Sequence, residues 1–350
     1  MQEKQAKQKQ QIHVTQLAAG KRFGRYKKED KKEVRKAEVK EDEILENLKQ
    51  IWQLIVFSMI PDDENDDEIY AKCLDKLKGV NCSSKDFELF SLALIGLTEE
   101  DFFQRKAGLF LSALIAYGKN ETYLLQTKNL NLEIECFGYE NRKNIIVEGD
   151  VSECLGNLMS DGKIIVKGNA EKYAGQGLSG GSIIINGDTG EGTGSLMDGG
   201  FIEVHGDAGE KVGEEMRGGI ILIKGDSGDD NGNGMTGGEI HIEGNVGQSL
   251  GRRMRGGLIE IKGNAGNYVG SGFDSDYNVL SFLSTAILGE EYDQTLRGMK
   301  GGKIIVRGSS GEKVGGNMTG GEIHVEGEIG SIGNVIHGKI YHKGELIVDK

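Results

Sequence analysis

Three residue types are scarce in this 350-residue chain, which has one tryptophan, one proline (Pro61) and four cysteines. Cys73, Cys82, Cys136 and Cys154 form no Cys-x-x-Cys pair, so they indicate neither a zinc site nor a disulfide framework. No apolar run approaches the ~20 residues that a membrane-spanning helix needs. The opening residues MQEKQAKQKQ contain no apolar signal region. We therefore expect a cytoplasmic protein without a membrane partner.

Positive charge is scarce outside the first forty residues. Residues 1–40 contain 13 Lys/Arg and 5 Asp/Glu, a net charge of +8, so the other 310 residues carry −21 of the total of −13. An acidic body argues against nucleic acid as a specific ligand. Residues 1–40 are predicted to be a disordered basic arm. Such an arm allows weak, non-specific nucleic-acid binding and contacts with an acidic partner or lipid.

Glycine, in contrast, is abundant, with 56 residues that show no three-residue period, which excludes collagen. From about Lys143 the chain aligns in blocks of nineteen residues that begin at glycine junctions. These junctions lie at Gly162, Gly181, Gly200, Gly219, Gly238, Gly257, Gly302 and Gly321. A fixed interval of this length predicts a repeat fold. The single longer step, between Gly257 and Gly302, indicates an insertion of 26 residues within one block.

Each block carries apolar residues at fixed positions. The third and fifth positions are Ile or Val from Ile145 and Val147 to Ile323 and Val325, and the positions between them are mixed. Alternation with period two predicts a strand with one buried face. The seventeenth position is Met or Leu, which suits a core column better than a copper site. The blocks therefore predict a single-stranded parallel β-helix of about nine coils, roughly 45 Å long.

The chain is thus predicted to have four parts. After the arm, residues 41–125 form a small helical domain, because apolar residues recur at helical spacing from Ile44 to Ile55. Residues 126–142 are a connector. Residues 143–350 form the β-helix, with an inserted arm at about 273–298.

The segments GGFIEVHGDAGEKVGEEMRGG (199–219) and GGLIEIKGNAGNYVG (256–270) resemble the GXGXG domain. That domain is the C-terminal right-handed β-helix of the glutamate synthase large subunit, and it also makes up most of one subunit of formylmethanofuran dehydrogenase. The resemblance covers about residues 143–347. It implies a right-handed β-helix that packs on catalytic parts, while flavin, iron–sulfur, amidotransferase or metal chemistry lies in those parts.

The resemblance therefore leads to one main hypothesis, a non-catalytic scaffold subunit with no catalytic residue and no cofactor of its own. Its partners would be protein subunits of a redox or amidotransferase-type complex. One alternative is a cofactor-binding fragment of an oxidoreductase related to glutamate synthase. A second alternative is a structural rod that assembles end to end.

Two stretches, GQGLSGG (175–181) and GNGMTGG (232–238), contain the spacing G-x-G-x-x-G. A dinucleotide site needs a strand before this motif and a helix after it, whereas here a strand of the next block follows at once. We interpret both stretches as coil corners. Their only unusual glycines are Gly177 and Gly234, at the sixteenth position of a block.

One turn contains a partial calcium-loop pattern. Its candidate ligands are Asp226, Asp229, Asn231 and Asn233, but the closing acid, Glu239, falls one position short. Asn231 also occupies a position that is mostly apolar in other blocks, so its amide must find buried partners. Two interpretations remain, a bound cation or an acidic turn with an internal Asn–Thr contact.

Two sets of apolar residues are candidates for partner binding. The insertion contains one set on one side of a possible helix, which either packs back on the rod or docks a partner. Its members are Val279, Phe282, Leu283 and Ile287. The second set lies at the outward second and fourth block positions, either exposed as a binding stripe or covered by the rest of the chain. Its members are Ile165, Ile184, Phe201, Ile220, Leu222, Leu258 and Ile305.

Overall fold

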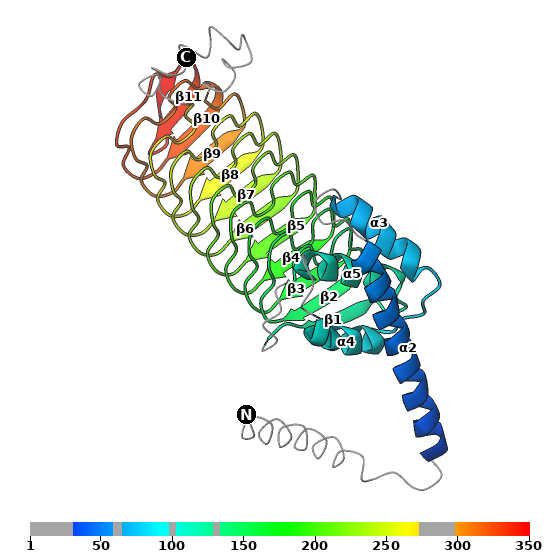
Figure 1. Cartoon of the computed structure of the whole chain (residues 1–350). Coiled ribbons are helices and arrows are strands. Elements are labelled where there is room, and N and C mark those ends of the chain that lie inside the picture. Colours follow the sequence, from blue (N-terminus) through cyan, green and yellow to red (C-terminus); the bar gives the residue numbers. More distant parts are fainter. Residues whose placement is uncertain (1–30, 59–64, 98–102, 129–133, 273–297) are drawn as a thin grey trace, which may run out of the picture. The chain divides into compact units, whose positions relative to one another are not determined.

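The computed structural model describes residues 31–58, 65–97, 103–128, 134–272 and 298–350, with the side chains of 31–42 left aside. The chain divides into two units, Met1–Gln50 and Ile51–Lys350. The described part of the first unit belongs to helix α2 (Lys31–Ser58). The second unit holds a β-solenoid of about ten turns, and the predicted mainly-β parallel coil is confirmed (Figure 1).

The described strands form a single sheet in chain order. All neighbours pair in parallel up to β11, and only β12 is antiparallel. The strands are β1 (Thr122–Gln126), β2 (Asn144–Glu148), β3 (Lys163–Val166), β4 (Ser182–Ile185), β5 (Phe201–Val204), β6 (Ile220–Ile223), β7 (Glu239–Ile242), β8 (Leu258–Ile261), β9 (Lys303–Val306), β10 (Thr319–Val325), β11 (His337–His342) and β12 (Glu345–Asp349).

The interior is built from columns of identical positions. The Ile and Val residues of the third and fifth block positions are at most 1% exposed, from Ile145 to Val325. The seventeenth-position column, Met159 to Met318 with Leu178, is completely buried. The strands of neighbouring coils pair residue for residue, so Ile183 lies beside Ile202 and Ile185 beside Val204 in these columns. These columns are the core that the nineteen-residue period predicts.

The corner of each coil requires left-handed backbone. Gly175, at the fourteenth position, has φ +70°, and a Cβ there would lie 2.5 Å from Ile202 Cδ1. The sixteenth position is left-handed too, whether it holds Gly177 (φ 64°), Leu196 (φ 59°) or Arg253 (φ 56°). The extra glycines therefore occupy positions where glycine relieves backbone strain, and strand β4 follows Gly181 directly.

Three further α-helices and a short 3-10 helix precede the sheet: α3 (Asp66–Leu77), α4 (Ser84–Ala93), η1 (Leu94–Leu97) and α5 (Phe103–Tyr117). Helices α3 and α4 both begin with capping boxes, in which Asn65 pairs with Glu68 and Ser83 pairs with Asp86. Ser83 is thus the N-cap residue of α4.

The helices pack on the first coil through aromatic residues. Phe87 of α4 contacts Tyr123 of β1 edge to face, with ring centroids 5.4 Å apart. Gly108 of α5 lies so close to the first coil that a Cβ would be 1.7 Å from the carbonyl oxygen of Glu135. Trp52 packs against Phe110 of α5 in the same helical cluster. The helices thus cover the first coil, which has no preceding coil to stack on.

The domain boundaries differ from the predicted ones in two places. Strand β1 pairs in parallel with β2, and the corner of the same coil follows, with Cys136 N donating to Glu153 O at 2.9 Å. The described residues of the predicted connector, 126–128 and 134–142, are therefore part of a first coil. Its period is 22 residues (Tyr123 pairs with Ile145) and no glycine pair precedes it, so the nineteen-residue alignment missed it. Helix α2 also begins at Lys31, inside the predicted basic arm.

The C-terminal end of the solenoid closes differently. His342 takes the inward position beside Val325 of β10, and its ring nitrogen bonds the carbonyl of Gly327 at 2.9 Å. Strand β12 then turns back antiparallel on β11, ending the parallel stack. The predicted insertion interrupts one coil without breaking the sheet, because β8 pairs directly with β9 across it.

We expect Gly213→Ala to lower the free energy of unfolding by about 2–4 kcal/mol, from left-handed strain plus overpacking. Gly213 has φ 64°, and its Cβ would lie 2.5 Å from Ile240 Cδ1. The matched control is Gly234→Ala, whose Cβ would have Glu215 Cγ as its nearest neighbour, at 3.3 Å. The control should cost about 1 kcal/mol. Equal losses in chemical denaturation would contradict this account of the corner.

Candidate functional site

The outward face of the sheet carries the predicted apolar residues. They lie in two columns, the second and fourth block positions, and most are half-buried, while Ile220 is 41% exposed. Parallel register places Phe201 beside Ile220, and Ile165 beside Ile184. These outward apolar residues are therefore partly accessible to solvent.

The predicted stripe is not continuous. Glu203 separates Ile184 from Leu222 in one column, and Glu239 separates Ile220 from Leu258 in the other. Leu258 and Ile305 are therefore apart from the rest. The sequence prediction also missed two half-buried residues, Leu124 and Ile146, that continue the column toward the N-terminal coils. We define the apolar patch by its seven members: Leu124, Ile146, Ile165, Ile184, Phe201, Ile220 and Leu222.

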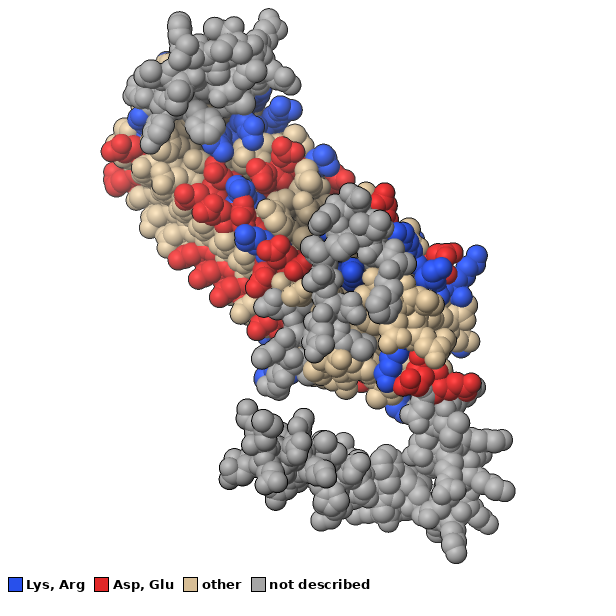
Figure 2. All heavy atoms as spheres, in the orientation of Figure 1, with Lys and Arg blue, Asp and Glu red and all other residues tan. Residues whose placement is uncertain are grey.

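Beyond the apolar patch, the same face is covered by paired charges. Glu243 contacts Lys224 at 3.2 Å and Lys262 at 3.0 Å, and these lysines hold the pKa of Glu243 below its usual value. Arg307 contacts Glu260 at 2.7 Å and lowers the pKa of that carboxyl in the same way. Figure 2 shows acidic and basic side chains interleaved over these strands. We call this region the charge-paired half of the face.

A ladder of Asp and Asn side chains runs along another edge of the coils. Each side-chain oxygen accepts the backbone N–H of the equivalent residue one coil further on, at 2.6 to 2.9 Å. Its members are Asp150, Asn169, Asp188, Asp207, Asp226, Asn245 and Asn264. Asp226, a candidate cation ligand, is therefore one rung of a structural ladder.

Asn231, the second candidate ligand, is buried and its amide has internal partners. Its Oδ1 accepts from the N–H of Val212 and from the Ser227 hydroxyl, both at 3.0 Å. Its Nδ2 donates to the Gly228 carbonyl at 2.8 Å. The partner is Ser227 rather than the threonine that the sequence suggested. These contacts are those expected of an internally satisfied turn.

The remaining two candidate ligands point to other neighbours. Asp229 accepts the N–H of Gln248 at 2.7 Å, and Asn233 lies between Glu214 and Arg253. Within the described part of the chain, no group of three or more His, Cys, Asp or Glu residues is arranged to hold a metal ion. Each of the four residues therefore forms its own hydrogen bonds between coils. Cation binding at this turn stays a hypothesis, which calcium titration would test.

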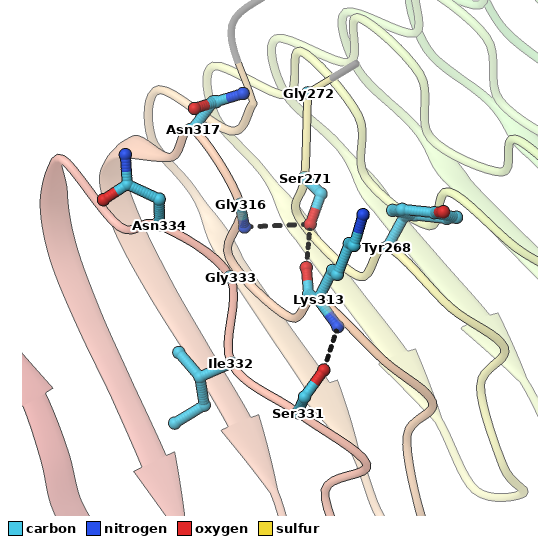
Figure 3. A pocket seen from close by; sticks show the side chains of 10 residues that line it. All are labelled: Tyr268, Ser271, Gly272, Lys313, Gly316, Asn317, Ser331, Ile332, Gly333 and Asn334. Atoms are coloured by element: carbon cyan, nitrogen blue, oxygen red, sulfur yellow. Dashed lines mark hydrogen bonds between the residues drawn. The ribbon is translucent and has the colours of Figure 1, made fainter. Parts of the chain in front are cut away.

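A cavity of about 290 Å³ lies beside Gly272, where the inserted segment leaves the coil (Figure 3). The Ser271 hydroxyl accepts from Gly316 N at 2.9 Å and donates to the carbonyl of Lys313. The N–H of Lys313 donates in turn to Ser331 Oγ at 3.0 Å. These polar groups link three successive coils, so the cavity belongs to the coil framework. The candidates Val279, Phe282, Leu283 and Ile287 lie outside the described residues.

Comparison with known proteins adds no identification, since no protein-family model matches the chain and no curated protein matches it significantly. Among the helices that the structure describes, none combines the length and the apolar character needed to cross a bilayer. The outward sheet face is therefore the candidate site that the geometry itself supports.

We expect Asn231→Ala to lower the free energy of unfolding by about 1–3 kcal/mol, because Val212 N–H and the Gly228 carbonyl lose a buried partner. Asn186→Ala, at an exposed position, should be nearly neutral. The melting temperature of the wild type should be the same in calcium and in a chelator. A chelator-induced drop that Asn231→Ala abolishes would instead support a bound cation.

Proposed function

We propose that this chain is a non-catalytic β-helix scaffold whose apolar patch binds a partner protein subunit. The single observation that supports this most is the division of the outward sheet face into an apolar half and a charge-paired half. Exposed apolar residues gathered in adjacent columns are typical of protein–protein interfaces. Here they lie on strands β1 to β6, and Ile220, at 41% exposure, is on β6 at the end of the patch next to the charge-paired half.

Rigidity of the frame makes the apolar patch a suitable docking surface. Every outward residue of the patch is followed by an inward Ile, Val or Leu that is at most 1% exposed. The strands therefore cannot rotate to bury the patch without exposing the core. A partner meets a preformed surface, so little conformational entropy is lost on binding.

The charge-paired half supplies specificity rather than affinity in this proposal. Its carboxylates already have partners, as Glu243 does with Lys224 and Lys262. Ion pairs at an exposed rim contribute little free energy, but misplaced like charges are costly, so this region disfavours wrong partners. An interface centred on the apolar patch with a charged rim follows the usual anatomy of such contacts.

The identity of the complex is proposed from the sequence resemblance alone. The glycine-rich blocks resemble the β-helix of glutamate synthase and the β-helical subunit of formylmethanofuran dehydrogenase. We therefore propose that the partner belongs to a redox or amidotransferase-type complex. The cofactors would then lie in the partner subunit.

The test is co-purification of the tagged full-length chain from its native cells. We expect a recurring partner that is lost with Ile220→Glu and retained with Lys303→Gln, a variant with the same change in charge on the charge-paired half. The eluted complex should show flavin or iron–sulfur absorbance, and the isolated chain should show none.

Two results would contradict the proposal. If the tagged chain purifies as a cofactor-free monomer without any recurring partner, the scaffold proposal is wrong. A flavin spectrum in the isolated chain would favour the alternative of a cofactor-binding oxidoreductase fragment. Circular dichroism of Ile220→Glu is the control that separates lost docking from lost folding.

A further inference from the structure

Two of the four cysteines occupy the same corner position in adjacent coils. Cys136 lies in the corner of the first coil and Cys154 in the corner of the second, with φ 54° and 61°. Coil-to-coil hydrogen bonds flank them on both sides, from Cys136 N to Glu153 O (2.9 Å) and from Gly156 N to Phe137 O (2.8 Å). Their backbones are therefore in register.

Side chains at this corner position meet across coils elsewhere in the solenoid. A Cβ placed on Gly192 would lie 2.5 Å from Cδ1 of Tyr173, its equivalent one coil earlier. Lys313 lies over the ring of Tyr268, again one coil earlier, with Nζ 5.8 Å from the centroid. The coils are spaced by roughly 4.8 Å. Disulfides span Cα separations of about 4.4–6.8 Å, so adjacent coils suit one.

The two thiols differ in exposure. Cys136 is 3% exposed and its Sγ lies 3.7 Å from the carboxylate of Asp66, the first residue of α3. Cys154 is only half-buried, so a small reagent reaches it first. The neighbouring Cys136 thiol lowers the pKa of Cys154, which favours the Cys154 thiolate, while the interaction with Cys154 and burial raise the pKa of Cys136.

The other two cysteines provide an internal contrast. Cys73 and Cys82 are completely buried among the helices. Burial raises the pKa of each thiol to about 12. Both should remain unreactive at neutral pH, because the thiolate is the reactive form.

We propose that Cys136 and Cys154 form a reversible dithiol–disulfide pair that links the first two coils. The proposed oxidant is a small peroxide. The Cys154 thiolate attacks one peroxide oxygen, the O–O bond breaks, and hydroxide leaves as Cys154 becomes a sulfenic acid. The Cys136 sulfur then attacks the Cys154 sulfur, and the sulfenic oxygen leaves as water with the Cys136 proton. One hydrogen peroxide oxidises two thiols and, with the thiolate proton, yields two waters.

Disulfide formation would also change the contact between α3 and the first coil. The thiol hydrogen that Cys136 donates to Asp66 is lost on oxidation, which leaves Asp66 with Arg105 as its partner. Asp67, the next residue of α3, keeps its contact with the hydroxyl of Tyr139. The pair thus connects the redox state to the N-terminal turn of α3, where the helices meet the solenoid.

The test is to treat the reduced full-length protein with stoichiometric hydrogen peroxide, then denature it and count free thiols by mass spectrometry. We expect two of four thiols to be lost, a mass decrease of two hydrogens and a Cys136–Cys154 cross-linked peptide. Dithiothreitol should restore all four thiols. Cys136→Ser should instead accumulate a sulfenic acid at Cys154, which dimedone traps.

Control variants keep the result unambiguous. Cys82→Ala should form the same cross-link, and Cys154→Ser should resist oxidation at Cys136. Four remaining thiols in the wild type, equal oxidation of Cys73 and Cys82, or disulfides only between molecules would each overturn the proposal. The wild-type experiment decides even where a variant fails to fold.

Discussion

Stacking of each coil on the next is the constraint on which the whole solenoid depends. A single four-residue strand cannot bury its Ile and Val side chains or satisfy its own backbone, so each coil requires two neighbours. Interior coils find them, as Ile183 does between Ile164 and Ile202. The first and last coils lack one neighbour each. Helices α4 and α5 cover the first, and antiparallel β12 ends the last.

Stacking also explains why polar residues recur so regularly. The Asp and Asn ladder, from Asp150 to Asn264, pairs side-chain oxygens with N–H groups of the following coil. Asn231 performs a similar task inside the core, where a neighbouring N–H has an amide as its partner. Residues that resemble a cation-binding loop in the sequence thus form hydrogen bonds between coils in the structure. The stacking direction, which is absent from a local motif, decides their role.

The same geometry places the two proposed sites. Stacking brings residues nineteen apart in the sequence into contact, so an outward apolar residue contributes to a patch only when the equivalent residue of the next coil is also apolar. Phe201 and Ile220 are both apolar and lie side by side, whereas Glu239 interrupts their column. Cys136 and Cys154 occupy the same corner position in adjacent coils for the same reason, although they are eighteen residues apart and share no recognisable motif. Individual residue types matter less here than which coil they meet.

The sequence by itself determined the repeat, its buried columns and the parallel β-helix, because a nineteen-residue period with Ile or Val two apart has no other way to bury its apolar face. The capping boxes of α3 and α4 are local interactions as well, each formed by residues three apart. Only the tertiary structure decided that a coil begins at β1, that the outward stripe is split, and that two cysteines occupy the same corner position in adjacent coils. Each of these depends on register between segments of irregular spacing, where one residue more or fewer changes every neighbour.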